Sequence, residues 1–118
     1  TWKEADTQKE AADLNQPLIA VNGGVPGKTY SFAGVEGDSV VLETVKRSED
    51  GSGVILRLYE SRNQRVNAKV NLFCTPAKVM ECSLLEEPDD GSCGVRMEQN
   101  GFAFTIRPYE IKTFKVVF

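Results

Sequence analysis

Apolar and polar residues alternate along several short stretches in the second half of the chain. One stretch sets Val66, Ala68, Val70 and Leu72 against Asn67, Lys69 and Asn71. A period of two places successive side chains on opposite faces of an extended strand, so this pattern predicts a strand with one buried and one solvated face. The same alternation predicts two further core rows: Phe102, Phe104 and Ile106, then Phe114, Val116 and Phe118.

Short runs rich in Val, Ile, Phe and Tyr recur from Pro17 onward, separated by clusters of Gly, Pro, Asn and Asp. This spacing is typical of an all-β fold. The predicted strands cover residues 18–22, 30–35, 39–46, 54–61, 65–74, 78–87, 95–98, 102–107 and 111–118. Asp50-Gly51 and Asn100-Gly101 accept positive φ and predict hairpin turns. We therefore predict an antiparallel β-sandwich, immunoglobulin-like, with about 7–9 strands.

The N-terminal residues have a different composition. Asp6 or Thr7 is a candidate helix N-cap, good helix formers follow to Leu14, and Asn15 and Pro17 end the pattern. We predict an N-terminal segment, residues 1–16, that leads in from a preceding domain, and a C-terminal β-sandwich domain, residues 17–118. The glycine-rich stretch 22–27 is expected to turn the chain into the sandwich, whose tightest part starts near residue 39. Without an initiator Met, the chain is expected to be a segment of a longer polypeptide.

The composition is that of a folded globular domain. Hydrophobic residues make up 41% and charged residues 26% of the 118 positions, and the net charge is -3. The basic residues are scattered among acidic ones and form no stripe that could follow phosphates, which argues against nucleic acid as a partner. No apolar run has the length needed to cross a bilayer, so we expect no membrane contact.

Cysteine and histidine content limits the chemistry of the chain. Cys74, Cys82 and Cys93 cannot all pair with one another, and their spacing matches no common zinc pattern. Without histidine, the chain holds no self-contained Ser-His-Asp triad, cysteine protease dyad or histidine zinc site. We expect no metal site and no cofactor in this segment. Thiols that cannot all pair indicate a reducing, cytoplasmic location.

Adjacent carboxylates are candidate glycosidase catalysts, because such enzymes use two acidic groups. The candidate pairs are Glu49 with Asp50, Glu86 with Glu87, and Asp89 with Asp90. All three pairs fall in or beside predicted turns, where acidic residues are common for local reasons. A calcium loop at residues 49–53 is disfavoured because the oxygen spacing does not fit. Among the aromatic residues, Phe73 lies on the polar face of its strand and is a candidate sugar platform or interdomain contact.

A second set of residues is expected to form a structural or interdomain network. Arg57 and Glu60 flank Tyr59 on a central strand, and an arginine fork can bind a carboxylate with two hydrogen bonds. Lys46, Glu49 and Asp50 could complement Arg57 across the hairpin. Three roles stay open for this network: ion pairs that stabilise the sandwich, docking against another domain, and direct substrate contact.

Four stretches of the chain resemble the C-terminal region of glycoside hydrolase family 38 α-mannosidases. They are Glu10–Leu18, Val40–Asp50 followed at once by Val54–Glu60, Cys82–Glu87 and Pro108–Phe114. Their order and spacing agree with the family across residues 10–118, and a departure is Ser48, where alanine is common. The resemblance implies a β-sandwich belonging to an enzyme that removes terminal α-linked mannose with retention, through an aspartate nucleophile and a zinc ion.

Those catalytic and zinc-binding positions belong to the family's catalytic domain, and none is carried over onto a residue of this chain. The leading hypothesis is therefore a non-catalytic accessory domain whose partners are the catalytic and middle domains of its own polypeptide, with a glycan contact at a shared rim as a further option. Two rivals stay open: a stand-alone carbohydrate-binding module, and an enzyme that uses Glu49 or Asp50.

Overall fold

The computed structural model describes residues 1–89 and 94–118. Asp90 and Cys93, both considered above, lie outside the described residues. The chain divides into two units, Thr1–Tyr30 and Ser31–Phe118. All strands of the described chain belong to the second unit.

The first unit contains helix α1, Thr7–Asn15, followed by an extended stretch. The predicted short helix is confirmed, with Asp6 at the N-cap position. None of the residues of α1 is buried. The predicted strand over residues 18–22 is wrong, because this described stretch pairs with no other strand. β-prone residues form a strand only where a partner backbone accepts their hydrogen bonds.

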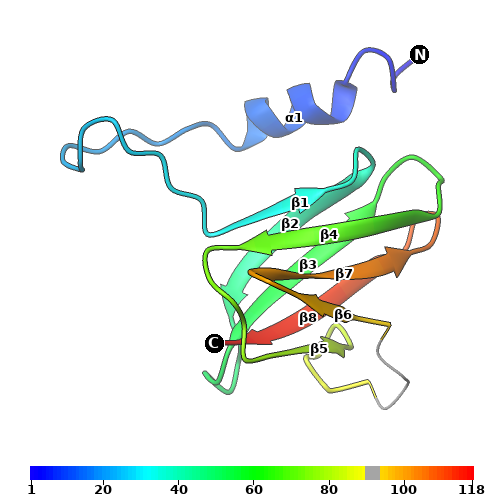
Figure 1. Ribbon diagram of the computed structural model, residues 1–118. Helices are drawn as coiled ribbons and strands as arrows, with labels where there is room; N and C mark the ends of the chain where they lie inside the picture. The colour runs from blue at the N-terminus through cyan, green and yellow to red at the C-terminus, as the bar shows by residue number, and fades with distance from the viewer. Residues whose placement is uncertain (90–93) are drawn as a thin grey trace. The chain divides into compact units, whose positions relative to one another are not determined.

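The second unit is a sandwich of eight described strands, which confirms the predicted all-β fold class (Figure 1). The strands are β1 Ala33–Glu36, β2 Val40–Arg47, β3 Val54–Glu60, β4 Val66–Leu72, β5 Lys78–Cys82, β6 Arg96–Glu98, β7 Gly101–Ile106 and β8 Ile111–Val117. The largest boundary error concerns β5, which ends at Cys82 and not at Glu87. Beyond Cys82 the chain leaves the sheet in a turn held by the Ser83 N–H, which donates to the Glu87 carbonyl (2.8 Å).

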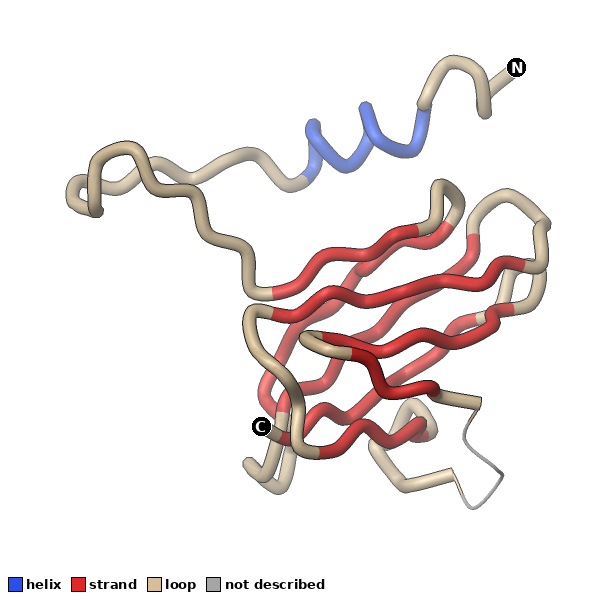
Figure 2. The backbone as a smooth tube through the Cα atoms, viewed as in Figure 1, coloured by secondary structure: helices blue, strands red, loops and turns tan. Residues whose placement is uncertain are grey.

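The strands form two four-stranded antiparallel sheets that pack face to face (Figure 2). The first sheet has the order β1-β4-β7-β6 and the second the order β2-β3-β8-β5. Both predicted hairpins, β2–β3 and β6–β7, are confirmed. In the second of them Asn100 has a φ of 54°. A Cβ added to Gly101 would lie 2.1 Å from the Val70 carbonyl oxygen, so glycine is required for β7 to pair with β4.

The core lies between the sheets and is centred on three phenylalanine rings. Phe114 lies 5.0 Å from Phe102 and 4.7 Å from Phe104 between ring centroids, and all three are at most 1% exposed. The predicted core rows of β4 and β7 are confirmed, as are Phe114 and Val116. Phe118 was wrongly assigned to the core: it is 44% exposed, since it lies one residue beyond the end of β8.

Candidate functional site

The residues singled out from the sequence come from β2, β3 and the turn between them, and the structure places them in three groups. Lys46, Glu49 and Asp50 lie around the turn, Arg57 and Tyr59 lie on the outer face of the second sheet, and Glu60 is buried at the opposite end of β3. Arg57 and Tyr59 point outward because they alternate with Leu56 and Leu58, which are in the core.

The β2–β3 turn is built by Ser48 and Asp50. Asp50 Oδ1 accepts hydrogen bonds from the Ser48 hydroxyl (2.7 Å), the Ser52 N–H (3.0 Å) and the Ser52 hydroxyl (2.9 Å). Ser48 Oγ in turn accepts the Gly53 N–H at 3.0 Å. These oxygens satisfy the polar groups of the turn itself, which is the ordinary structural use of Ser and Asp in turns.

Charges from three segments meet beside this turn. Lys46 Nζ lies 2.7 Å from Glu49 Oε1 and 2.6 Å from Glu86 Oε1. The other oxygen of Glu86 accepts the Glu49 N–H at 2.8 Å. Lys115 Nζ, on β8, lies 2.6 Å from Asp50 Oδ2. We call these five residues the turn cluster: Lys46, Glu49, Asp50, Glu86 and Lys115.

The electrostatics of the turn cluster favour charged carboxylates. Lys115, together with the Ser48 and Ser52 hydrogen bonds, holds the pKa of Asp50 well below its usual range. Lys46, followed by the Glu49 N–H, lowers the pKa of Glu86. A glycosidase general acid needs a raised carboxyl pKa, so this cluster has the electrostatics of a structural network.

Glu86 and Lys115 are the members of the turn cluster that sequence reasoning missed. Glu86 was singled out only as half of an acidic pair beside a predicted turn, and Lys115 was not singled out at all. Glu86 lies 37 residues from its hydrogen-bond partner Glu49 in the sequence, and Lys115 lies 65 residues from its partner Asp50. Only the sheet order brings these segments together, so the local sequence carried no signal for the contacts.

The Ser83–Glu87 loop crosses the outer face of the second sheet. It leaves edge strand β5 at Cys82 and returns where Pro88 pairs with Cys82. Between these points Glu86 reaches Lys46 on β2, the opposite edge of the same sheet. Ile55, on the same outer face of β3 and in register with Lys46 of β2 and Lys115 of β8, is 0% exposed.

Arg57 lies near the centre of that outer face, between Thr44 of β2 and Thr113 of β8 in register. Its Nε donates to Thr113 Oγ1 (3.3 Å) and its Nη2 donates to the Leu84 carbonyl (3.4 Å). Glu49 and Asp50, the complements considered from the sequence, bind lysines instead. Arg57 therefore joins β3 to β8 and to the Ser83–Glu87 loop.

Glu60 fastens the end of β3 to the β7–β8 connection. Its carboxylate accepts the Arg62 N–H at 2.7 Å and the Tyr109 N–H at 2.9 Å, and Glu60 is 2% exposed. Burial by itself would raise the pKa of Glu60, but hydrogen bonds to the carboxylate, led by those from the N–H groups of Tyr109 and Arg62, outweigh it and lower the pKa to about 2. Glu60 is thus a buried structural anion, remote from the turn cluster.

Acid is expected to destabilise the sandwich through these carboxylates. Glu60 has a folded pKa of about 2 against 4.5 for the unsupported group, and the pKa values of Asp50 and Glu86 are also lowered. A depressed folded pKa contributes stability above the unfolded value and loses it as pH falls towards the folded value. The free energy of unfolding should therefore hold from neutral pH to about pH 5 and decline towards about pH 2.

Urea unfolding followed by circular dichroism at a series of pH values measures this decline. A Glu60→Gln variant should show a shallower decline, because its position no longer titrates. An equally steep decline in that variant would show that Glu60 is not a source of the acid sensitivity.

Three phenylalanines form a partly exposed group at one end of the sandwich. Phe73 is 46% exposed, and its ring centroid lies 5.1 Å from Phe32 and 4.9 Å from Phe118. The planes of these pairs are inclined by 30° and 49°. Sugar-stacking platforms present a flat ring face, whereas these rings pack against one another.

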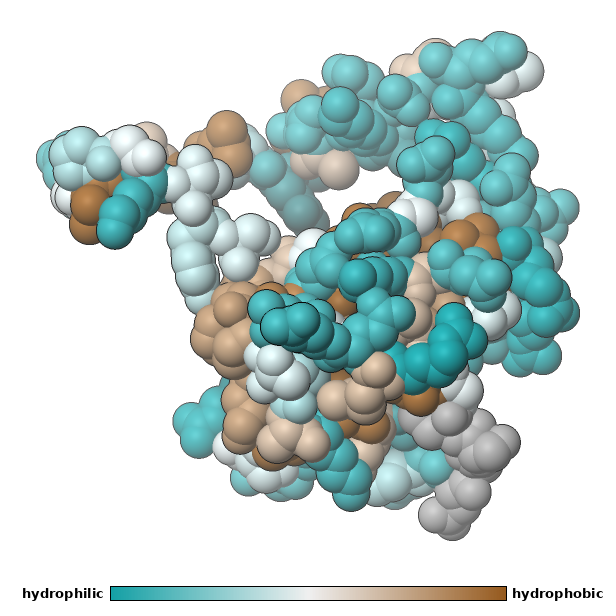
Figure 3. All heavy atoms as spheres, viewed as in Figure 1, coloured by the Kyte–Doolittle hydropathy of each residue, from teal (hydrophilic) through white to brown (hydrophobic). Residues whose placement is uncertain are grey.

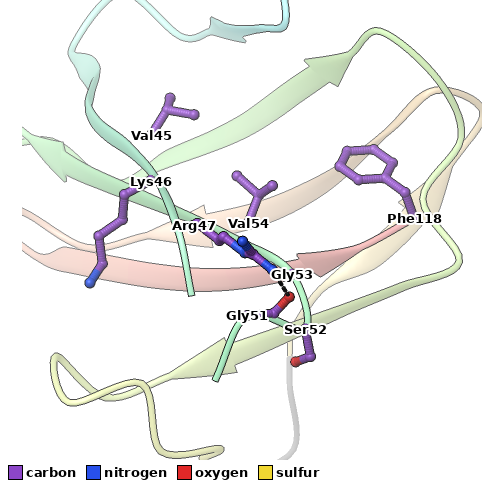
Figure 4. Close-up of a pocket in the computed structure, with 8 residues that line it drawn as sticks. All are labelled: Val45, Lys46, Arg47, Gly51, Ser52, Gly53, Val54 and Phe118. Carbon is purple, nitrogen blue, oxygen red and sulfur yellow. Dashed lines mark hydrogen bonds between the residues drawn. The ribbon is translucent and has the colours of Figure 1, made fainter. Parts of the chain in front are cut away.

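A shallow depression lies between this group and the β2–β3 turn (Figure 4). Val45, Val54 and Phe118 supply its apolar side, and Lys46 points away from them. Arg47 Nη2 lies 3.5 Å from the Gly51 carbonyl and spans the turn. The lining is mainly apolar and offers few polar groups to orient a small ligand.

Within residues 1–89 and 94–118, no three His, Cys, Asp or Glu side chains group as metal ligands would. Cys74 is half-buried, and the buried Cys82 thiol donates to the Met80 carbonyl at 3.7 Å. The sulfur and carboxylate donors of the described chain therefore do not fit a zinc ion. No helix in the described residues is long and apolar enough to cross a membrane.

Comparisons with known proteins identify relatives along nearly the whole chain. Residues 39–114 match the model of the glycosyl hydrolases family 38 C-terminal beta sandwich domain. Alpha-mannosidase 2C1 of Homo sapiens and that of Mus musculus are each 29% identical over 122 residues, which cover 99% of this chain. Alpha-mannosidase G of Dictyostelium discoideum is 29% identical over 90 residues, 74% of this chain. The chain spans 12% of the first two proteins and 8% of the third.

Proposed function

Because the chain belongs to the family 38 glycosyl hydrolase C-terminal β-sandwich domains, we propose that it is a non-catalytic accessory domain that packs against the catalytic part of a longer polypeptide. We call that longer chain the parent polypeptide. These relatives are α-mannosidases by name, and we propose that the parent polypeptide hydrolyses terminal α-linked mannose. The role of the sandwich is then to hold neighbouring segments in place by packing.

The observation that carries this proposal is the exposure of apolar side chains in the first unit. Leu18, Ile19, Val21 and Val25 are between 66% and 102% exposed. Figure 3 shows apolar, brown atoms along the stretch of the first unit that follows α1. Consecutive exposed apolar residues mark a contact with another protein surface. The relatives carry the matching stretch within chains about eight times as long, so the covering surface is proposed to be the rest of the parent polypeptide.

The charged residues of the sandwich support a non-catalytic role. Asp50 and Glu86 are ion-paired with lysines, and Glu60 is buried under backbone N–H groups. The resemblance to retaining α-mannosidases makes the parent polypeptide a zinc enzyme in this proposal. Its zinc would be bound outside this chain, whose described donors do not fit the ion. Its catalytic and middle domains are the proposed partners, and the cytoplasm is the proposed compartment.

Deleting residues 1–118 from the parent polypeptide tests the proposed function. The truncated protein should melt at a lower temperature and hydrolyse a chromogenic α-mannoside more slowly, because segments that packed on the sandwich lose their support. Differential scanning calorimetry and initial rates measure the two effects. Full activity and an unchanged melting temperature in the truncated protein would refute the accessory role.

Two assays on the isolated 118-residue chain separate the rival functions. We expect no turnover of the α-mannoside and no heat on titration with mannose oligosaccharides. Turnover that disappears in a Glu49→Ala variant, or saturable oligosaccharide binding, would replace the proposal with an enzyme or with a carbohydrate-binding module.

A further inference from the structure

Arg57 differs from the other shielded basic residues on the strands. Lys46, Lys69, Lys112 and Lys115 are each at least half-buried, and each lies within 2.9 Å of a carboxylate. Arg57 is also half-buried, yet among the described residues its hydrogen bonds go to two neutral oxygens, Thr113 Oγ1 and the Leu84 carbonyl. Its charge therefore lacks the carboxylate partner that the four lysines have within the described chain.

The two hydrogen bonds fix the guanidinium and leave donors available. A guanidinium carries five N–H groups, of which Arg57 uses one on Nε and one on Nη2 in these bonds. Thr113 is 2% exposed and lies in the middle of β8, so one anchor of the guanidinium is rigid. An arginine held in this way loses little side-chain entropy when it binds a carboxylate with two hydrogen bonds.

Large apolar side chains surround Arg57 on the same face. Tyr59 lies two residues along β3 and pairs in register with Ile111, which is 57% exposed. Leu84, whose carbonyl accepts the Arg57 hydrogen bond, is 61% exposed. We call Arg57, Tyr59, Leu84 and Ile111 the Arg57 surface. Arginine and tyrosine beside exposed aliphatic groups are typical of the residues that dominate the energy of protein interfaces.

The Ser83–Glu87 loop that completes this surface is held from several sides. Ser83 Oγ accepts the N–H groups of Leu85 (3.2 Å) and Glu87 (3.3 Å). Glu86 is bound by Lys46 and by the Glu49 N–H, as described above. A loop with its backbone and its ends fixed presents Leu84 in a set position, which favours docking of a preformed partner.

We propose that the Arg57 surface is the docking site for an acidic side chain, flanked by apolar groups, in the remainder of the parent polypeptide. The inference rests on the proposed function and adds the face that docks and the chemistry of its partner. Charge complementarity indicates which group binds there, because the Arg57 guanidinium is a fixed, half-buried cation whose hydrogen bonds go to neutral oxygens. Such a cation favours a carboxylate as its partner. The relatives carry this domain as 12% of one continuous chain, so the carboxylate is assigned to that chain and not to a second copy.

Hydrogen exchange on the whole parent polypeptide and on the isolated 118-residue chain tests the docking face. Amides of residues 83–87 should exchange more slowly in the parent polypeptide. Equal exchange there, with slower exchange elsewhere in the chain, would refute the Arg57 surface while preserving the accessory role. Equal exchange throughout residues 1–118 would refute the proposed function itself.

Charge reversal tests the carboxylate. In the parent polypeptide, Arg57→Glu should speed amide exchange at residues 83–87 by roughly tenfold or more, compared with the same polypeptide without the substitution. This is the size of effect expected when a charge pair at an interface is lost. Arg96→Glu, the same charge change on an exposed strand of the other sheet, is the matched control and should leave it unchanged.

The same two variants in the isolated chain correct for local loss of the Thr113 and Leu84 hydrogen bonds. The proposal requires the effect of Arg57→Glu to be larger in the parent polypeptide than in the isolated chain. Equal effects in both would show that Arg57 only stabilises the sandwich and would overturn the proposal. A dimer of the isolated chain, detected by sedimentation, would assign the Arg57 surface to a second copy of the chain. That outcome would also overturn the proposal.

Discussion

Replacing Phe114 with alanine is expected to lower the free energy of unfolding of the sandwich by about 3–5 kcal/mol. Phe114 is 0% exposed and its ring contacts those of Phe102 and Phe104, so truncation leaves a cavity enclosed by both sheets. The loss includes two aromatic contacts worth about 0.5–1.5 kcal/mol each beyond buried area. Such a loss is a large fraction of the about 5–15 kcal/mol by which a native domain is usually stable.

Phe118→Ala is the matched control for this variant, because it removes the same kind of ring from the residue that follows β8. Phe118 is 44% exposed, so Phe118→Ala should lower the free energy of unfolding by well under half as much as Phe114→Ala. Urea denaturation of both variants measures the difference. Similar losses for the two would mean that the centre of the core is not at Phe114.

Replacing Glu60 with alanine is expected to lower the free energy of unfolding by about 2–4 kcal/mol. The carboxylate accepts the N–H groups of Arg62 and Tyr109 through part-buried hydrogen bonds, and its removal takes this acceptor away from both donors. Tyr109 has a φ of 55°, so the turn that presents its N–H is conformationally demanding and depends on this support. We expect the β7–β8 connection to loosen along with the loss of stability.

Glu98→Ala supplies the comparison for Glu60. Glu98 pairs with Lys69 at 2.9 Å at a partly exposed site, where such a pair contributes less than about 1 kcal/mol. Glu60→Gln retains one oxygen acceptor and should fall between the two alanine variants. If Glu60→Ala proved no more costly than Glu98→Ala, the buried hydrogen bonds would not be the source of stability proposed here.

The local sequence was sufficient for the fold class and most of the strands. Alternation of apolar residues in β4 and β7 specifies which face is buried, because a strand has a side-chain period of two whatever it pairs with. Asp50-Gly51 and Asn100-Gly101 specify two hairpins, because positive φ is a local backbone property. Helix α1 also followed from propensity and its stop residues.

Two errors have one physical cause, which is that a strand depends on its partner as well as on its own residues. Residues 18–22 have strand-forming side chains but no paired backbone within the described chain. The stretch after Cys82 leaves β5 because Ser83 and Glu87 bond to each other in a turn. Local propensity cannot decide between a ladder and a turn when the ladder requires a distant segment.

For the candidate site, the sequence determined which residues carry charge and which face of a strand they share. It determined that Lys46, Glu49 and Asp50 lie near one turn, since they are neighbours in the chain. Only the tertiary structure decided that Asp50 binds Lys115, that Glu86 crosses the sheet to Lys46, and that Arg57 has neutral partners. These contacts depend on the order β2-β3-β8-β5, and sheet order is set by packing of the whole core, which no short stretch of sequence encodes.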